Sequence, residues 1–149
     1  MTYLLKARRG IKRLIFHHFG AHPPEGMNVP KIRDMHMKDR GWDDIGYHGV
    51  IMPDGEFSIG RDIQSVGAHT FGSNRQSIGI MFMAGIRPGH DFTKPNTQQL
   101  ATARLIANEQ IRYYGHGLEI LGHRDASKRP TLCPGFDVPH WYETNEVRA

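Results

Sequence analysis

The sequence predicts a single α/β domain in which helices flank a central mixed β-sheet. Short runs rich in β-branched and aromatic residues alternate along the chain with stretches whose apolar residues recur at helical spacing. The 149 residues suffice for one domain with a buried core, and no internal repeat, low-complexity tract or linker divides them. We therefore treat residues 1–149 as one domain that begins with a basic arm at residues 1–10.

Five stretches have the composition of strands: residues 13–19, 46–52, 56–59, 77–83 and 118–121. Pro53-Asp54-Gly55 separates the second from the third and predicts a hairpin turn, because proline fixes φ and glycine tolerates positive φ. His17 and His18 are neighbours in the first strand, so their side chains point to opposite faces of the sheet. Only one of the two can face a given site.

A first helix is expected between Asn28, which is a good N-cap residue, and Gly41, which is a good helix stop. Pro30 falls in its first turn, where proline is tolerated. Its helically spaced face, which we expect to pack against the sheet, consists of Ile32, Met35 and His36.

Two further helices are expected in the second half of the chain. Thr97 is expected to cap a helix that runs to about Tyr113 and ends at Gly115. Asp137 is expected to cap a short last helix whose first turn contains Pro139. Two aromatic residues of that last helix should cover the core, namely Trp141 and Tyr142.

Composition narrows the class of protein. Charged residues make up 23% and hydrophobic residues 38% of the chain, which is ordinary for a globular domain. No apolar run approaches the roughly 18 residues of a membrane span, and the N-terminus lacks the pattern of a signal peptide. We therefore expect synthesis in a cytoplasm and no membrane span.

The formal net charge is +4, and basic residues gather near the start of the chain at Lys6, Arg8, Arg9, Lys12 and Arg13. This cluster could steer the protein to an anionic surface such as a cell wall, or it could be a solvated arm without a partner. Direct nucleic-acid binding is not expected, because the basic residues are not interleaved with aromatic ones.

A stretch near the C-terminus places His123 and the only cysteine, Cys133, on one short irregular segment. Imidazole nitrogen and thiolate sulfur are ligands that Zn²⁺ prefers. A third ligand would have to come from elsewhere, and the first strand supplies His17 or His18. A single cysteine excludes an internal disulfide. Spacing alone leaves a purely structural alternative open, in which the cysteine is a small buried hydrophobic residue and the histidines are not ligands.

Six short motifs occur in one order: His17 in an apolar strand, Gly46-Tyr47-His48, Val66-Gly67-Ala68-His69, Asn74 followed by Ser77-Ile78-Gly79-Ile80, Gly122-His123-Arg124-Asp125, and Cys133-Pro134-Gly135. Over residues 11–143 this series resembles the type 2 N-acetylmuramoyl-L-alanine amidases, a family that includes amidase-type phage lysozymes and peptidoglycan recognition proteins. The small size is most similar to the phage lysozymes. The resemblance implies a five- to six-stranded sheet with the metal in a groove on one side.

The resemblance also implies the site. Its metal ligands are expected to be His17, His123 and Cys133, which leave one position for water, as in catalytic zinc sites. Tyr47 and Thr131 are expected to assist catalysis. Many family members carry lysine where this chain has Thr131, so Lys128 is a second choice. The residues expected to contact substrate are His48, His69, Thr70 and Asn74.

The implied reaction is zinc-dependent hydrolysis of the amide between N-acetylmuramic acid and L-alanine in bacterial peptidoglycan. The residues alone indicate only a zinc hydrolase of a polar substrate. We expect a monomeric phage endolysin, made in the host cytoplasm and acting in the periplasm after release. One alternative is a peptidoglycan-binding module without catalysis, which Cys133 disfavours because such receptors typically lose that ligand. Another is an additional regulatory role through binding of the phage RNA polymerase by the basic arm.

Overall fold

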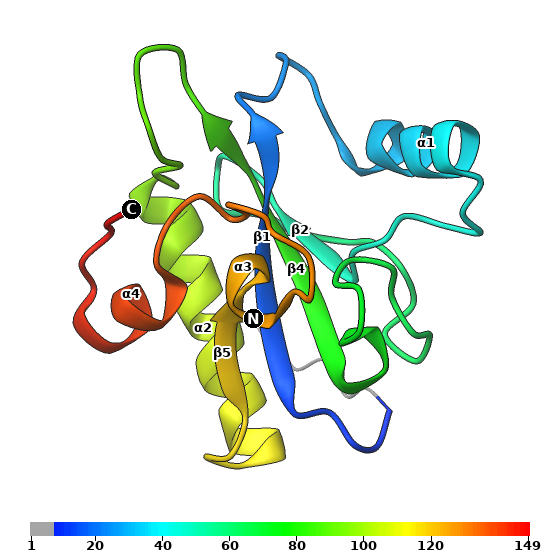
Figure 1. The fold of residues 1–149 in the computed structure, drawn as a ribbon, viewed down its shortest axis with the longest axis vertical. Coiled ribbons are helices and arrows are strands. Elements are labelled where there is room, and N and C mark those ends of the chain that lie inside the picture. The colour runs from blue at the N-terminus through cyan, green and yellow to red at the C-terminus, as the bar shows by residue number, and fades with distance from the viewer. Residues whose placement is uncertain (1–7) are drawn as a thin grey trace.

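A computed structural model describes residues 8–149, and its centre is a five-stranded sheet in the order β3-β2-β4-β1-β5 (Figure 1). The strands are β1 (Arg13–Ala21), β2 (Gly49–Ile51), β3 (Phe57–Ile59), β4 (Ser77–Ile86) and β5 (Glu119–Gly122). Four of them run parallel, and β3 pairs antiparallel with β2. The predicted mixed sheet is therefore confirmed, although the strand predicted at residues 46–52 is shorter than expected.

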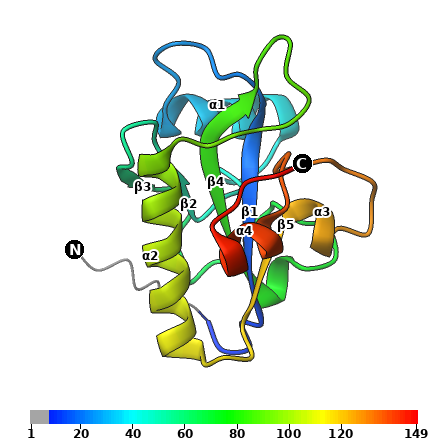
Figure 2. The ribbon, with the colours of Figure 1, turned by 90° about the vertical axis from the view of Figure 1, so that its left-hand side faces the viewer.

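Helices lie on both sides of this sheet. They are α1 (Val29–Arg40), α2 (Thr97–Tyr114), α3 (His123–Ala126) and α4 (Val138–Thr144), with a short 3₁₀ turn at Asn74–Gln76. In Figures 1 and 2, α2 and α4 lie on one side of the sheet and α1 on the other. In the part of the chain that the structure describes, no helix combines the length and the apolar character needed to cross a membrane.

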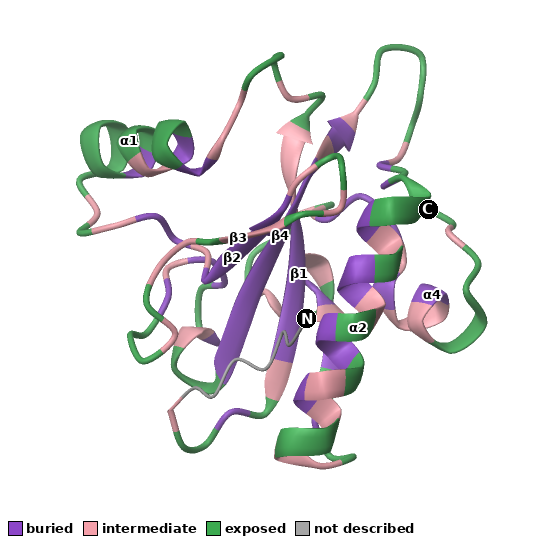
Figure 3. Ribbon diagram, turned by 180° about the vertical axis from the view of Figure 1, so that it is seen from behind, coloured by how far each residue is buried: buried purple, intermediate pink, exposed green. Residues whose placement is uncertain are grey.

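The larger core fills the space between the sheet and α2. Strand residues such as Leu14, Phe16 and Phe82 are fully buried there against α2, which contributes Ala103, Ile106 and Ala107. The C-terminal segment closes the core with Phe136, Val138 and Trp141. Figure 3 shows the consequence as a buried stripe along α2 and buried central strands.

Strand alternation gives β1 two different faces. Leu14 and Phe16 point into the α2 core, so Ile15 and His17 point to the opposite face. A smaller cluster covers that face, in which Val29 and Ile32 of α1 pack with strand residues including Val50, Met81 and Met83. Met35, predicted on the packed face of α1, is instead 41% exposed, because α1 joins this cluster through Val29 and Ile32.

The helix caps were predicted with one error. Asn28 caps α1, Gly41 ends it in a left-handed conformation, and Asp137 caps α4, as expected. The cap of α2 is Asn96 rather than Thr97: the Asn96 side chain accepts from the backbone N–H of Gln99 at 2.8 Å. The Gln99 side chain accepts in turn from the Asn96 N–H at 3.1 Å. This reciprocal capping box displaces Thr97 into the first helical position.

Part of the basic arm is not solvated. Residues 1–7, including Lys6, lie outside the described residues. The guanidinium of Arg8 donates to four backbone carbonyl oxygens, those of Ile63, Ser65, Asn74 and Ser77. Arg8 therefore ties together the two ends of the loop between β3 and β4, and for this residue the expectation of a free arm is wrong.

The capping box gives a prediction about stability. Asn96→Ala should lower the free energy of unfolding by about 1 kcal/mol, because it leaves the Gln99 N–H without its acceptor. Thr97→Ala is the matched control and should change stability by less than about 0.5 kcal/mol. Urea denaturation of the three proteins measures both values. A larger loss for Thr97→Ala than for Asn96→Ala would contradict the assignment of the cap.

Candidate active site

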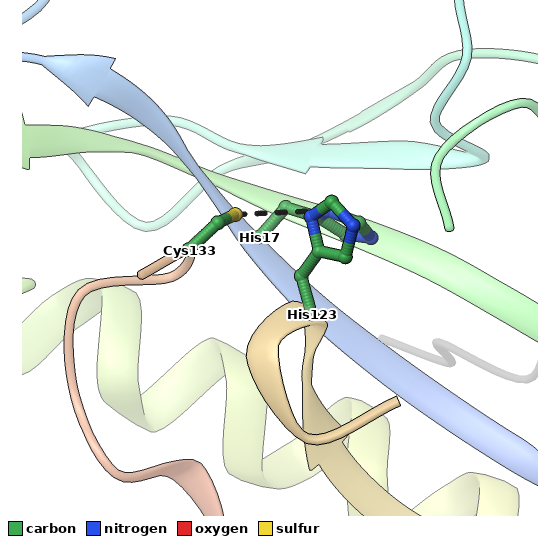
Figure 4. Close-up of side chains that lie close together, drawn as sticks. All are labelled: His17, His123 and Cys133. Carbon is green, nitrogen blue, oxygen red and sulfur yellow. Dashed lines mark hydrogen bonds between the residues drawn. The ribbon is translucent and has the colours of Figure 1, made fainter. Parts of the chain in front are cut away.

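Three side chains that could bind a metal converge from separate elements (Figure 4). His17 lies in the middle of β1, His123 is the first residue of α3, and Cys133 lies in the loop that follows α3. Phe16 pairs with Gly122 across β1 and β5, so the residues that follow these two, His17 and His123, are brought together. One ligand atom from each of the three residues lies within 4.8 Å of the others.

Backbone contacts fix the cysteine in this cluster. The Cys133 sulfur lies 3.8 Å from Nδ1 of His17 and accepts from the His18 backbone N–H at 3.4 Å. The Cys133 carbonyl accepts from the N–H of Arg124 at 2.7 Å, which joins the loop to α3. The thiol is thus held at the site by the strand that carries one candidate ligand and the helix that carries the other.

The protonation states suit a metal site. Burial lowers the pKa of His17 well below its usual value, and the neighbouring His69 and His123 lower it further. Burial also lowers the pKa of His123. Both imidazoles are therefore neutral near pH 7, which is the form that binds a metal. Burial raises the pKa of Cys133 to about 12, so metal binding would displace one proton, that of the thiol.

A second layer of side chains orients His17. Its Nε2 atom lies 3.0 Å from Nδ1 of His69 and 3.4 Å from the Thr70 hydroxyl, which leaves Nδ1 directed at Cys133. His69 fits because residue 79 is glycine: a Cβ atom there would lie 2.5 Å from the His69 ring. Contacts of this kind fix the tautomer and direction of a ligating imidazole.

His18 points away from the cluster, as strand alternation predicts. Its Nδ1 atom lies 2.6 Å from the hydroxyl of Thr93, on the side of the sheet that faces α2. Burial and the neighbouring His123 lower the pKa of His18 to about 4. Its neutral ring holds the loop before α2 near β1, so its side chain is committed to packing.

The sequence pattern of the N-acetylmuramoyl-L-alanine amidases matches residues 7–136. The chain belongs to this family. It is 34% identical over 146 residues to the endolysin of Enterobacteria phage T3, covering 95% of this chain and 92% of that one. It is 37% identical over 125 residues to the endolysin of Klebsiella phage KP32, covering 81% and 78%. The solved endolysin amidase LysCS from Clostridium intestinale superposes with a TM-score of 0.72 at 27% identity, covering 91% of this chain and 84% of that one.

The family predicted from the six motifs is thus confirmed, and the protein is an N-acetylmuramoyl-L-alanine amidase. Its substrate is peptidoglycan. The cluster of His17, His123 and Cys133 is consistent with the metal site of such an amidase.

The three residues expected to assist catalysis lie at different positions relative to the cluster. The Tyr47 ring lies 5.0 Å from the ring of His17, and burial together with the Cys133 sulfur raises the pKa of its phenol, which stays protonated. Thr131 lines a hollow together with His123. Lys128 is exposed, and its aliphatic stem lies against Gly72, on a neighbouring part of the surface. Two of the three therefore lie at the cluster.

Three of the four residues expected to contact substrate line the same hollow, which has a volume of about 380 Å³: His69, Thr70 and Asn74. The Asn74 side chain also shapes this loop, because its oxygen accepts from the backbone N–H groups of His69 and Thr70 at 3.0 and 2.8 Å. The hollow opens directly beside His123, so it is where a substrate would reach the cluster.

The fourth residue, His48, is only 2% exposed and does not line the hollow. Its Nε2 atom lies 2.8 Å from the carbonyl oxygen of Ser65, and its Nδ1 atom accepts from the Gly79 N–H at 3.1 Å. This placement gives His48 a part in joining β4 to the loop, and leaves little surface for a ligand.

Sequence reasoning missed the arginines and the aromatic residues that line the hollow: Arg40, Trp42, Phe71 and Arg129. They lie in or beside loops between the six motifs, and no periodicity or spacing marks them. Only the folded chain brings the end of α1, the loop before β4 and the loop after α3 around one opening.

The paired histidines give the prediction of this subsection. His17→Ala should abolish stoichiometric metal binding, because it removes a ligand from the cluster, whereas His18→Ala should keep most of it. Metal content of the purified variants, measured by atomic emission, distinguishes them. Loss of metal from His18→Ala with retention in His17→Ala would mean that the assignment along β1 is off by one residue.

Proposed function

We propose that this amidase is a phage endolysin that uses a zinc ion, held by His17, His123 and Cys133, to release L-alanine-linked stem peptides from N-acetylmuramic acid. The observation that carries the proposal is the convergence of two neutral imidazoles and a half-buried thiol beside an open hollow. The similarity to two proteins named endolysin, over 95% and 81% of this chain, supports the biological role.

The donor set fits zinc. Two nitrogens and one sulfur, without a carboxylate in the cluster, are the soft and borderline ligands that zinc accepts in catalytic sites with three protein ligands. When bound, zinc would supply an activated water and a Lewis acid for the amide carbonyl. The Nε2 atom of His17 has its own partners in His69 and Thr70, so the ring would keep its direction through a reaction.

We assign the proton handling to Tyr47. Its raised pKa keeps the phenol protonated at neutral pH, so it can donate a hydrogen bond to a developing oxyanion or a proton to the leaving amine. We assign a supporting hydrogen bond to Thr131. Its hydroxyl oxygen accepts from the Cys133 N–H at 3.2 Å, which leaves the hydroxyl hydrogen free to donate into the hollow.

The setting follows from the endolysin role. We propose that the chain is made in the host cytoplasm and, after release, acts as a monomer on peptidoglycan in the periplasm. A purely binding role is disfavoured because Cys133, the ligand that such receptors typically lose, lies beside both histidines. A regulatory role through the phage RNA polymerase stays a prediction from resemblance. Of the basic residues that would carry it, Lys6 lies outside the described residues and Arg8 is bound to backbone carbonyl oxygens of the same chain.

The proposed function predicts a specific product. Digestion of purified Gram-negative peptidoglycan should release free stem peptides that begin with L-alanine, detected by mass spectrometry. A zinc chelator should abolish release, and added zinc should restore it. Cys133→Ala should be inactive and should have a lower melting temperature in zinc, because a bound metal stabilises the folded state. Full activity in chelator, or products cut at another bond, would contradict the proposal.

The helper assignments predict an order of effects on kcat with a purified muropeptide. Tyr47→Phe should lower kcat at least about 100-fold with zinc retained, because proton transfer contributes on that scale. Thr131→Ala should cost less, Thr131→Lys should be tolerated, and Lys128→Ala should change little because its stem lies against Gly72. A silent Thr131→Ala together with an inactive Lys128→Ala would reassign the supporting role to Lys128.

A further inference from the structure

The lining of the hollow beside His123 contains positively charged side chains and no negatively charged ones. Two arginines line it, Arg40 from the end of α1 and Arg129 from the loop after α3, and none of its lining residues is acidic. Among the described residues neither arginine takes part in an ion pair. An opening lined by positive groups of this kind attracts anions.

Each arginine rests on an aromatic ring of the same hollow. The guanidinium of Arg40 lies 5.0 Å from the centre of the Trp42 ring, and that of Arg129 lies 4.2 Å from the centre of the Phe71 ring. Such a cation–π contact restrains the guanidinium, and its N–H groups that do not face the ring can donate hydrogen bonds to a further acceptor. The rings therefore hold both arginines in place for a planar acceptor such as a carboxylate.

Phe71 itself is 56% exposed. A large aromatic side chain on a loop tip is more commonly buried than left in water. Contact with Arg129 links the loop before β4 to the loop after α3, so two walls of the hollow meet at this pair. Both walls would then respond together to a ligand that binds the guanidinium.

The substrate offers an anion at the required distance. In a peptidoglycan stem peptide the second residue is D-glutamate linked through its side chain, so its α-carboxyl group is free. This group lies within about 7 Å of the amide to be cut, since two residues span at most about 3.5 Å each. The hollow contains His123 and Thr131, so it is within reach of this carboxylate when the amide lies at the cluster.

We propose that Arg129, held by Phe71, and Arg40, held by Trp42, bind the free α-carboxylate of the D-glutamate residue and make the amidase selective for stem peptides in which this group is not amidated. The proposal rests on the proposed function, because it concerns the same substrate. It assigns to this chain a specificity device built from residues that lie outside the six family motifs.

Two synthetic substrates test it: an N-acetylmuramoyl tripeptide with the glutamate α-carboxylate free, and the same compound with that group amidated. The wild-type enzyme should have a kcat/KM about 10-fold higher for the acid, since a hydrogen bond to a charged group is worth about one such factor. The difference should lie in KM, because the arginines act in binding. It should shrink as salt is raised, because both guanidinium groups are exposed to solvent.

Variants separate this reading from a general loss of function. Arg129→Gln and Arg40→Gln should each raise KM for the acid and leave KM for the amide unchanged, and the double variant should treat both compounds alike. Phe71→Leu should weaken the preference while Arg129 is still present. Arg112→Gln is the matched control, because it removes the same charge from an exposed position on α2 outside this hollow.

The outcomes are distinguishable. Equal cleavage of acid and amide by the wild-type enzyme would overturn this inference and leave the amidase function intact. Equal losses on both substrates in the arginine variants would also overturn it, because the arginines would then contact another part of the ligand. Failure to cleave either compound would overturn the proposed function, and this inference with it.

Discussion

The position of β1 between two parallel neighbours is the constraint on which the rest of this structure depends. β1 pairs with β4 on one side and β5 on the other, and its residues alternate between the α2 core and the opposite face. Phe16 is fully buried in the core, which stabilises the fold by about 1.5–3 kcal/mol. The same alternation directs His17 to the opposite face of the sheet, and the end of β5 places His123 beside it. A one-residue slip of β1 would exchange the faces of Phe16 and His17, so the core fixes the register of the candidate ligand.

The face that carries His17 is stabilised in a different way. Buried polar groups cost about 1–3 kcal/mol each when they lack partners, and here the partners form a connected set. His17 contacts His69, the backbone of His69 is bound by Asn74, and Arg8 ties down the carbonyls at both ends of the loop. Gly79 leaves the space that the His69 ring occupies. The loop thus orients a side chain of the candidate metal cluster and also lines the hollow beside it.

Much of this architecture could be predicted from the sequence, because local rules and motif order both apply to it. The strand with His17, the caps Asn28 and Asp137 and the turn at residues 53–55 follow from residue types and spacing.

The predicted cap of α2 was wrong by one residue. Asn96 and Thr97 are both good N-cap residues, and only the reciprocal hydrogen bond between Asn96 and Gln99 decides between them. The arm was misjudged at Arg8 because its partners are backbone carbonyls, which no sequence pattern displays. The arginine–aromatic pairs were missed for a related reason. Their residues line a hollow between segments that meet only in the folded chain.

The proposed activity depends on an open three-ligand zinc site formed by His17, His123 and Cys133. X-ray absorption at the zinc edge of the purified amidase tests it most directly. We expect two nitrogen ligands at about 2.0–2.1 Å, one sulfur at about 2.3 Å and one further light atom from solvent. The sulfur contribution should vanish in Cys133→Ala. A spectrum without sulfur in the wild-type protein, or one with four protein ligands and no solvent position, would contradict the proposed zinc site.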